Sequence, residues 1–137
     1  MKIESKTGKT NYPAVHVYHF ISDFRNFKNF IPADKVTEWQ ADSNTCSFRM
    51  DLLGKISLDI VEKEPVKLVK ISSNPKVSQY NFNLWIQIKE VSESESRIKV
   101  TIEPKLNQVL LSMVKSPLKS FVDSLVDEVE KFQFPGQ

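Results

Sequence analysis

Apolar residues are spaced in two different ways along this chain. Over residues 14–31 and 106–132 they recur every three or four positions, whereas between about residues 36 and 103 they occupy alternate positions. Spacing by three and four places side chains on one face of a helix, and alternation places them on one face of a strand. The pattern therefore predicts short helices near the N-terminus, a run of strands in the middle and one long C-terminal helix. A short strand is also expected within residues 2–8.

Pro13 marks the expected start of the first helix. Proline suits the first helical position because the N–H that it lacks would have no partner there, and Asn11 or Tyr12 precedes it as a cap. The predicted buried face of this region comprises Ala14, Val17, Phe20, Ile21, Phe24, Phe27, Phe30 and Ile31. We expect two short helices here, the second ended by Pro32.

Two alternating segments, 45–51 and 55–60, are predicted to form a β-hairpin. Their apolar sets are Cys46, Phe48 and Met50 in the first segment and Ile56, Leu58 and Ile60 in the second. Both sets can face one core only if the loop keeps them in phase, and a loop of Leu52, Leu53 and Gly54 does so. This loop pairs Met50 with Ile56. In the same register, the next inner pair is Phe48 and Leu58. Gly54 then stands where a left-handed backbone conformation is needed.

Further strands are predicted at 67–73, 79–91 and 97–103, with a weaker strand at 36–41 that carries Trp39. The positions that share their inner face are Val69, Ile71, Ser73, Tyr80, Phe82, Leu84, Ile86, Ile88, Ile98, Val100 and Ile102. Trp85 has the opposite phase and is expected on the outer face of the sheet.

The C-terminal segment predicts one long amphipathic helix. Its apolar positions are Val109, Leu110, Met113, Pro117, Leu118, Phe121, Leu125, Val129 and Phe132. A sheet with one apolar face and a helix with one apolar stripe bury those surfaces against each other. The chain is therefore predicted to be an α+β protein.

Length and composition narrow the class of protein. The 137 residues suffice for one domain, expected over 1–134 with a disordered tail at 135–137. Three glycines and one cysteine exclude a glycine-rich phosphate loop, an intrachain disulfide and a Cys-x-x-Cys motif. A net charge of +2 does not predict a nucleic-acid partner. Because no apolar stretch approaches the ~20 residues that span a bilayer, a cytoplasmic protein without a membrane span is expected.

The side chains that could perform chemistry are few. Asp51, Asp59 and Glu103 fall on the outward phase, so no pair of buried carboxylates is expected. His16, His19 and Asp23 share one side of the first helix at a spacing that a metal could use, but this side is the polar one. Cys46 lies in an apolar strand face with no base beside it, and is expected to be structural. We therefore predict no catalytic residue, no metal and no cofactor.

The order of the elements and three short motifs resemble a known superfamily. The motifs are Val17-Tyr-His-Phe-Ile-Ser-Asp-Phe24 followed by Ile31-Pro32, Val61-Glu-Lys-Glu-Pro65, and Met113-Val-Lys-Ser-Pro-Leu118. The chain resembles the helix-grip START/Bet v 1-like superfamily (SRPBCC), in its bacterial polyketide cyclase/dehydrase-like branch. This resemblance implies a curved antiparallel sheet of six to seven strands, with two short helices after the first strand and the long C-terminal helix on the concave face. It also implies an apolar cavity between this helix and the sheet.

The resemblance and the apolar inner face together predict the function. We expect non-catalytic binding of a small hydrophobic molecule such as a lipid, quinone or polyketide. The residues expected to line its site are Phe27, Phe48, Met50, Leu58, Ile71, Tyr80, Phe82, Val100, Met113, Pro117 and Phe121, with Tyr80 as the polar contact. If Met113 lines the site, Met113→Trp is expected to fill it and to weaken ligand binding while leaving the fold intact. Two alternatives are a polyketide cyclase/dehydratase-like enzyme and a protein-interaction module, with a homodimer or protein partner on the Trp85 face.

Overall fold

The computed structural model describes residues 1–31, 34, 36–51, 54–78 and 80–134. Its elements confirm the predicted α+β order of strand, short helices, strands and long helix. They are β1 (Ile3–Glu4), β2 (Gly8–Thr10), α1 (Ala14–Ile21), the 3₁₀ helix η1 (Phe24–Asn29), β3 (Val36–Ala41), β4 (Thr45–Met50), β5 (Gly54–Glu64), β6 (Leu68–Ser73), β7 (Asn81–Ser92), β8 (Glu95–Lys105) and α2 (Gln108–Lys131).

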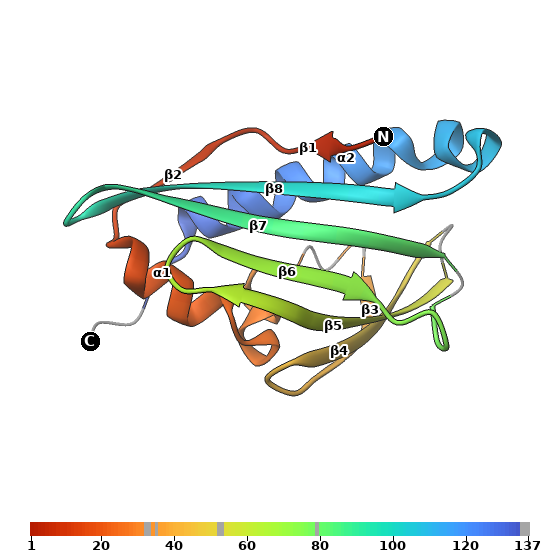
Figure 1. Ribbon diagram of the computed structural model, residues 1–137, viewed down its shortest axis with the longest axis horizontal. Helices are drawn as coiled ribbons and strands as arrows, with labels where there is room; N and C mark the ends of the chain where they lie inside the picture. The colour runs from red at the N-terminus through yellow and green to blue at the C-terminus, as the bar shows by residue number, and fades with distance from the viewer. Residues whose placement is uncertain (32–33, 35, 52–53, 79, 135–137) are drawn as a thin grey trace.

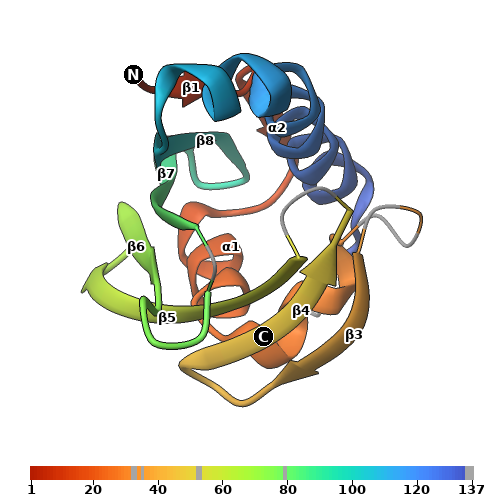
Figure 2. The ribbon, with the colours of Figure 1, turned by 90° about the vertical axis from the view of Figure 1, so that its right-hand side faces the viewer.

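The strands form one antiparallel sheet in the order β1-β8-β7-β6-β5-β4-β3, and β2 also pairs with β8. β1 and β2 are two pieces of one N-terminal segment, so the sheet has eight strands where six to seven were expected. Figures 1 and 2 show the sheet curving around α1, while α2 runs along the β8 side. The long helix α2 therefore packs on the concave side of the sheet, as predicted, and α1 lies within the same curve.

Helix α2 also covers the β1–β2 edge of the sheet. The backbone N–H of Lys6 donates to Asp123 Oδ1 at 2.8 Å, and that of Lys9 donates to Glu130 Oε2 at 2.9 Å. At this edge, carboxylate oxygens of α2 thus accept the backbone hydrogen bonds that the carbonyl groups of a further strand would otherwise accept. Gly8 lies at the closest approach, where a Cβ atom would overlap Val126 Cγ1.

The β4–β5 hairpin keeps the predicted inner face but not the predicted register. Met50 lies opposite Gly54, and Phe48 lies opposite Ile56, which is two residues from the expected partners. Gly54 has the expected left-handed backbone, with φ of 71°, but it begins β5. The turn therefore starts one residue earlier, at Asp51. Leu52 and Leu53 lie outside the described residues.

The first helix differs from the prediction at both ends. Pro13 is the N-cap itself, and neither Asn11 nor Tyr12 caps the helix through a side chain. Tyr18 is buried, whereas Phe20 is only half-buried, and the Phe20 ring joins an aromatic cluster at the end of α2. The cluster pairs Phe20 with Phe132 at 4.8 Å between ring centroids, and Phe132 with Phe134 at 5.0 Å. Pro32, the expected end of the next helix, is outside the described residues.

The first half of α2 has a different phase from the one predicted. Its buried residues are Leu111, Val114 and Leu118, whereas Val109 and Met113 are 70% and 58% exposed. Residues 111, 114, 118, 121, 125 and 129 form one continuous stripe at intervals of three and four. The sequence carries a second apolar stripe on this half of the helix, and that stripe faces away from the sheet.

Candidate ligand-binding cavity

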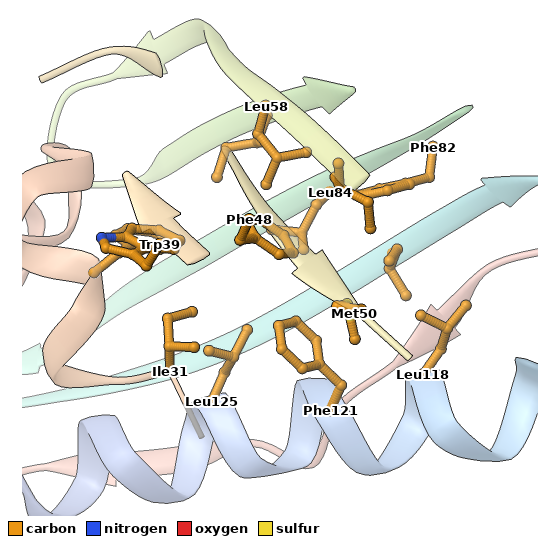
Figure 3. Close-up of a pocket in the computed structure, with 14 residues that line it drawn as sticks. Ile31, Trp39, Phe48, Met50, Leu58, Phe82, Leu84, Leu118, Phe121 and Leu125 are labelled. Carbon is orange, nitrogen blue, oxygen red and sulfur yellow. The ribbon is translucent and has the colours of Figure 1, made fainter. Parts of the chain in front are cut away.

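An apolar cavity of about 30 Å³ lies between the inner face of the sheet and α2 (Figure 3). Its lining residues are Phe27, Ile31, Trp39, Phe48, Met50, Ile56, Leu58, Ile71, Phe82, Leu84, Ile102, Leu118, Phe121 and Leu125. A volume of this size holds roughly two water molecules. The side chains therefore nearly fill the space in this conformation.

The lining side chains come from both sides of the fold. Figure 3 shows Leu118, Phe121 and Leu125 rising from α2 toward the strands, at the helical spacing of three and four. Phe48 and Met50 approach from β4, with Met50 near Phe121. The cavity is therefore the interface between helix and sheet, and its width depends on how far apart these two layers lie.

Trp39 reaches the cavity because β3 contains a β-bulge. Thr37 pairs with Arg49 and Gln40 with Ser47, so Glu38 and Trp39 together stand opposite Phe48. Glu38 takes a left-handed backbone conformation, with φ of 56°. An extra residue in one strand reverses the phase beyond it. Trp39 consequently stacks on Phe48, with ring centroids 5.7 Å apart and an interplanar angle of 26°.

The structure brings together most of the residues expected at the site. Phe27, Phe48, Met50, Leu58, Ile71, Phe82 and Phe121 all line the cavity. Val100 is buried in the core, and Tyr80 is half-buried at the edge of the core, but neither belongs to the lining. Met113 and Pro117 lie on the exposed side of α2, so their expected position was wrong. The cause is that α2 turns the stripe of Leu111, Val114 and Leu118 toward the sheet, so that Met113 and Pro117 face outward.

Several lining residues were not predicted as site residues. Five of them lie at positions that the sequence pattern predicts to face the core, but they were not selected as site residues: Ile56, Leu84, Ile102, Leu118 and Leu125. Ile31 lies on the predicted buried face of the N-terminal helical region, whereas no periodic signal marks Trp39. Trp39 is flanked by polar residues in a short edge strand, and its direction depends on the bulge at Glu38.

Among the residues that the structure describes, no titratable side chain lines the cavity. Cys46 is buried nearby in β4, and this burial raises the pKa of its thiol above the ordinary value. Asp23 caps η1 by accepting the backbone N–H of Arg25 at 2.9 Å and pairs with the Arg25 guanidinium at 2.7 Å, which lowers the pKa of the carboxyl. Among the described residues, no group of three or more His, Cys, Asp or Glu side chains could hold a metal.

Trp85 lies on the outer face of the sheet, as predicted. The ammonium groups of Lys2 and Lys70 lie 5.0 Å and 5.6 Å from its ring centroid. Cation–π contacts of this kind hold an aromatic ring on a polar surface. The two tryptophans therefore report on opposite faces of the sheet, Trp39 on the cavity and Trp85 on the outside.

Comparison with known proteins shows similarity in structure only. No protein-family model matches the sequence, and no curated protein matches it. A conserved protein from Geobacillus kaustophilus is similar with a TM-score of 0.71 and 8% identity, covering 96% of this chain and 93% of that one. A START superfamily protein from Mycobacterium smegmatis has a TM-score of 0.67 and 11% identity over 96% and 99% of the two chains.

Norcoclaurine synthase from Thalictrum flavum is also similar, with a TM-score of 0.68 and 12% identity over 98% of this chain and 89% of that one. These similarities show that the chain has the helix-grip fold of START-like and Bet v 1-like proteins. In the described part of the chain, none of the helices has the length and apolar character needed to cross a membrane.

Proposed function

We propose that this protein binds a small hydrophobic molecule, such as a lipid, quinone or polyketide, between the sheet and α2, without catalysis. One observation carries the proposal: every described side chain that lines the cavity is apolar or aromatic, and the indole nitrogen of Trp39 lies on the side of its ring away from the other labelled residues (Figure 3). An apolar cavity of this kind does not retain ordered water and accepts apolar guests. The ligand's buried part is therefore uncharged.

A ligand must widen the cavity, because pockets for drug-sized molecules measure about 300 Å³ or more. The main chain of α2 packs against β8, β2 and β1. Across the cavity, α2 meets β4 and β5 through side chains such as Phe48 and Met50. In the described part of the chain, no main-chain hydrogen bond joins α2 to β4 or β5, so separating these side chains from Phe121 breaks none there. The flexible thioether of Met50 adapts to new neighbours.

The fold neighbours support this proposal in one respect. The structure of norcoclaurine synthase was determined in complex with dopamine and hydroxybenzaldehyde, both of which are aromatic compounds. A fold similar to that of this chain thus accommodates aromatic molecules. The cavity wall here, with Trp39, Phe48, Phe82 and Phe121, offers aromatic surfaces for such a guest.

Mass spectrometry under native and denaturing conditions tests whether a natural ligand is present. We expect a non-covalent adduct that survives gentle desolvation and disappears on denaturation. If the protein carries no adduct and also takes up no apolar fluorescent probe, the proposal fails.

Trp39 then locates the binding site. In a Trp85→Phe variant, emission comes from Trp39 alone, and we expect an added apolar ligand to change it. In the matched Trp39→Phe variant, emission comes from Trp85 on the outer face and should stay constant. A response of Trp85 without a response of Trp39 would place the ligand elsewhere.

Leu118→Phe should weaken binding, because the larger side chain takes up cavity space. Overpacking of a core costs about 1–3 kcal/mol of stability, so folding is checked by circular dichroism. Met113→Trp is the matched control, because Met113 is exposed on the other side of α2 and its replacement leaves the cavity unchanged. Equal ligand affinity of folded Leu118→Phe and the unaltered protein would contradict the proposed site.

A further inference from the structure

Ser73 is a polar side chain among the residues that enclose the cavity. It follows Ile71 at the alternating positions of β6 that face inward, and it is 8% exposed. Leu58 of β5 lies opposite Ser73 in the sheet, and the backbone N–H of Phe82 in β7 donates to Ser73 Oγ at 2.9 Å. The side chains of Ile71, Leu58 and Phe82 all line the cavity. Ser73 therefore lies between two strands that form the cavity wall, although it is not itself among the lining residues.

The proton of the Ser73 hydroxyl is held less firmly than those of two comparable serines. Ser5 and Ser78 are also buried, and their hydroxyl oxygens accept a backbone N–H at 2.8 Å and 2.9 Å. Both donate their own proton to a backbone carbonyl oxygen, at 2.7 Å and 3.0 Å. Ser73 donates instead to a side chain, Asn81 Oδ1, at 3.4 Å, whereas hydrogen bonds between two oxygens are usually about 2.7–2.8 Å long. Because Asn81 is exposed, its amide can turn toward water and leave the Ser73 proton to another acceptor.

The Ser73 hydroxyl lies on the side of the cavity away from α2. In Figure 3, Leu58 and Phe82 stand on that side, and Phe121 rises from α2 toward them. A guest that widens the cavity by displacing Leu58 and Phe82 reaches the hydroxyl between them. Cys46, on the other side of Leu58, offers only a thiol, which is a weak hydrogen-bond donor. Ser73 is thus the stronger donor on this part of the wall.

We propose that Ser73 selects a ligand whose apolar body ends in a carbonyl oxygen. This oxygen accepts the Ser73 proton, while the backbone N–H of Phe82 keeps its hydrogen bond to Ser73 Oγ. A carboxylate suits the position less well, because a buried charge needs a paired charge, and no titratable side chain among the described residues lines the cavity. This role of Ser73 rests on the proposed binding function, and it adds the orientation of the ligand: the carbonyl points toward β6 and the apolar body toward α2.

Two probes of nearly the same shape test the role of Ser73. Acetylnaphthalene carries a carbonyl oxygen where isopropenylnaphthalene, substituted at the same ring position, carries a methylene group, and equilibrium dialysis gives the Kd of each. We expect Ser73→Ala to weaken binding of the ketone roughly fivefold, the usual effect of losing one neutral hydrogen bond, and to change binding of the hydrocarbon less than about twofold. Both probes meet the same altered fold, so an equal change in their affinities would show a structural effect alone and overturn the proposal.

Further variants separate the Ser73 hydroxyl from its surroundings. Ser73→Thr keeps the hydroxyl and should keep the ratio of the two Kd values. Ser72→Ala is the matched control, because the Ser72 hydroxyl lies on the outer face of the sheet, where it donates to Asn83 Oδ1 at 2.6 Å. If Ser73→Ala does not fold, Ser73→Cys replaces it in the same comparison, since a thiol is a weak donor of similar shape. A loss specific to the ketone in Tyr80→Phe, but not in Ser73→Ala, would place the polar contact at Tyr80 and overturn the proposal.

The same measurements distinguish failure of this role from failure of the binding function. If both probes bind the unaltered protein and lose affinity equally in Ser73→Ala, the binding function stands and only the role of Ser73 is wrong. If neither probe binds the unaltered protein, the binding function fails and the role of Ser73 fails with it.

Discussion

Glu38 determines the direction of the aromatic side chain that follows it. Its left-handed backbone forms the bulge in β3, and its carboxylate pairs outside the sheet with Arg49 Nε at 2.8 Å. The bulge turns Trp39 onto Phe48 in the cavity wall. One residue in a rarely populated conformation thus contributes an aromatic surface to the candidate site.

Replacing Glu38 should therefore move Trp39. Valine is strongly disfavoured at positive φ, so Glu38→Val should cost about 1 kcal/mol or more and shift the emission of Trp39 to longer wavelength as its ring leaves the apolar wall. The measurement uses the Trp85→Phe background. Glu38→Asn is the control, because it also removes the ion pair with Arg49 but tolerates the left-handed conformation. Identical emission of the two variants would refute the role of the bulge.

Cys46 should make stability depend on pH in the alkaline range. Burial raises the pKa of its thiol in the folded protein above the ordinary value of 9.0, so the folded state favours the protonated form. This contribution is complete below the unfolded pKa and is lost as the pH rises above it, by up to about 1.4 kcal/mol per pH unit. Denaturant unfolding should show the protein losing stability relative to Cys46→Ala above about pH 9. If the free energies of unfolding of the two proteins changed in parallel with pH, this expectation would be contradicted.

At the scale of elements, α2 performs two tasks along its length. Its second half seals the β1–β2 edge through Asp123 and Glu130, and its buried stripe closes the core. The first half closes the same core but leaves Val109 and Met113 outside. The strands and helices themselves were largely predictable, because their apolar periods are long and regular.

Gly8 sets the distance between α2 and the sheet edge. A Cβ atom there would overlap Val126, so Gly8→Ala should destabilise the protein by about 1–3 kcal/mol. Val126→Ala removes the obstructing methyl groups. In a double-mutant cycle measured by denaturant unfolding, Gly8→Ala should therefore cost less in the Val126→Ala background. Additive effects would show that the two residues do not determine this contact.

Other features of the elements could not be predicted from the pattern. The first half of α2 has two apolar stripes, and their spacing alone does not decide that Leu111 and Val114 face inward. The register of the β4–β5 hairpin depends on where Gly54 adopts its positive φ, and both candidate registers keep the same apolar face. Periodicity determines which face is buried, but it does not distinguish shifts of two residues along a strand.

At the scale of the whole molecule, the fold consists of a firmly joined part and a part closed by side chains. β7 and β8 pair along nearly their full length, and β8 also holds β1, β2 and α2. β3 is an edge strand with a bulge, and it lies with β4 across the cavity from α2. The volume of the cavity depends on details of side-chain packing, which explains why the sequence predicted its apolar wall but not its size.

Hydrogen exchange should reveal this division. Amides in β7 and β8 should exchange slowest, and those in β3 fastest among strands β3 to β8, because β3 pairs with one neighbour only and local opening costs least where the fewest contacts break. Binding of a cavity ligand should slow exchange in β3 and β4 more than in β7 and β8. Uniform exchange across the sheet, or protection by ligand only in β7 and β8, would contradict the proposed widening at the β4 side.

The sealing of the sheet edge by α2 also has a consequence for biosynthesis. Lys6 donates its backbone N–H to Asp123, and Lys9 donates to Glu130, so the first strands find these partners only when the last helix has been made. Until then, a nascent chain that has left the ribosome as far as β8 exposes the apolar sheet face and an unpaired edge, both of which promote aggregation. Contacts between such distant segments also slow folding. A ribosome that stalls before α2 would therefore release a chain that depends on chaperones, whereas a full-length chain can complete its fold as soon as the helix emerges.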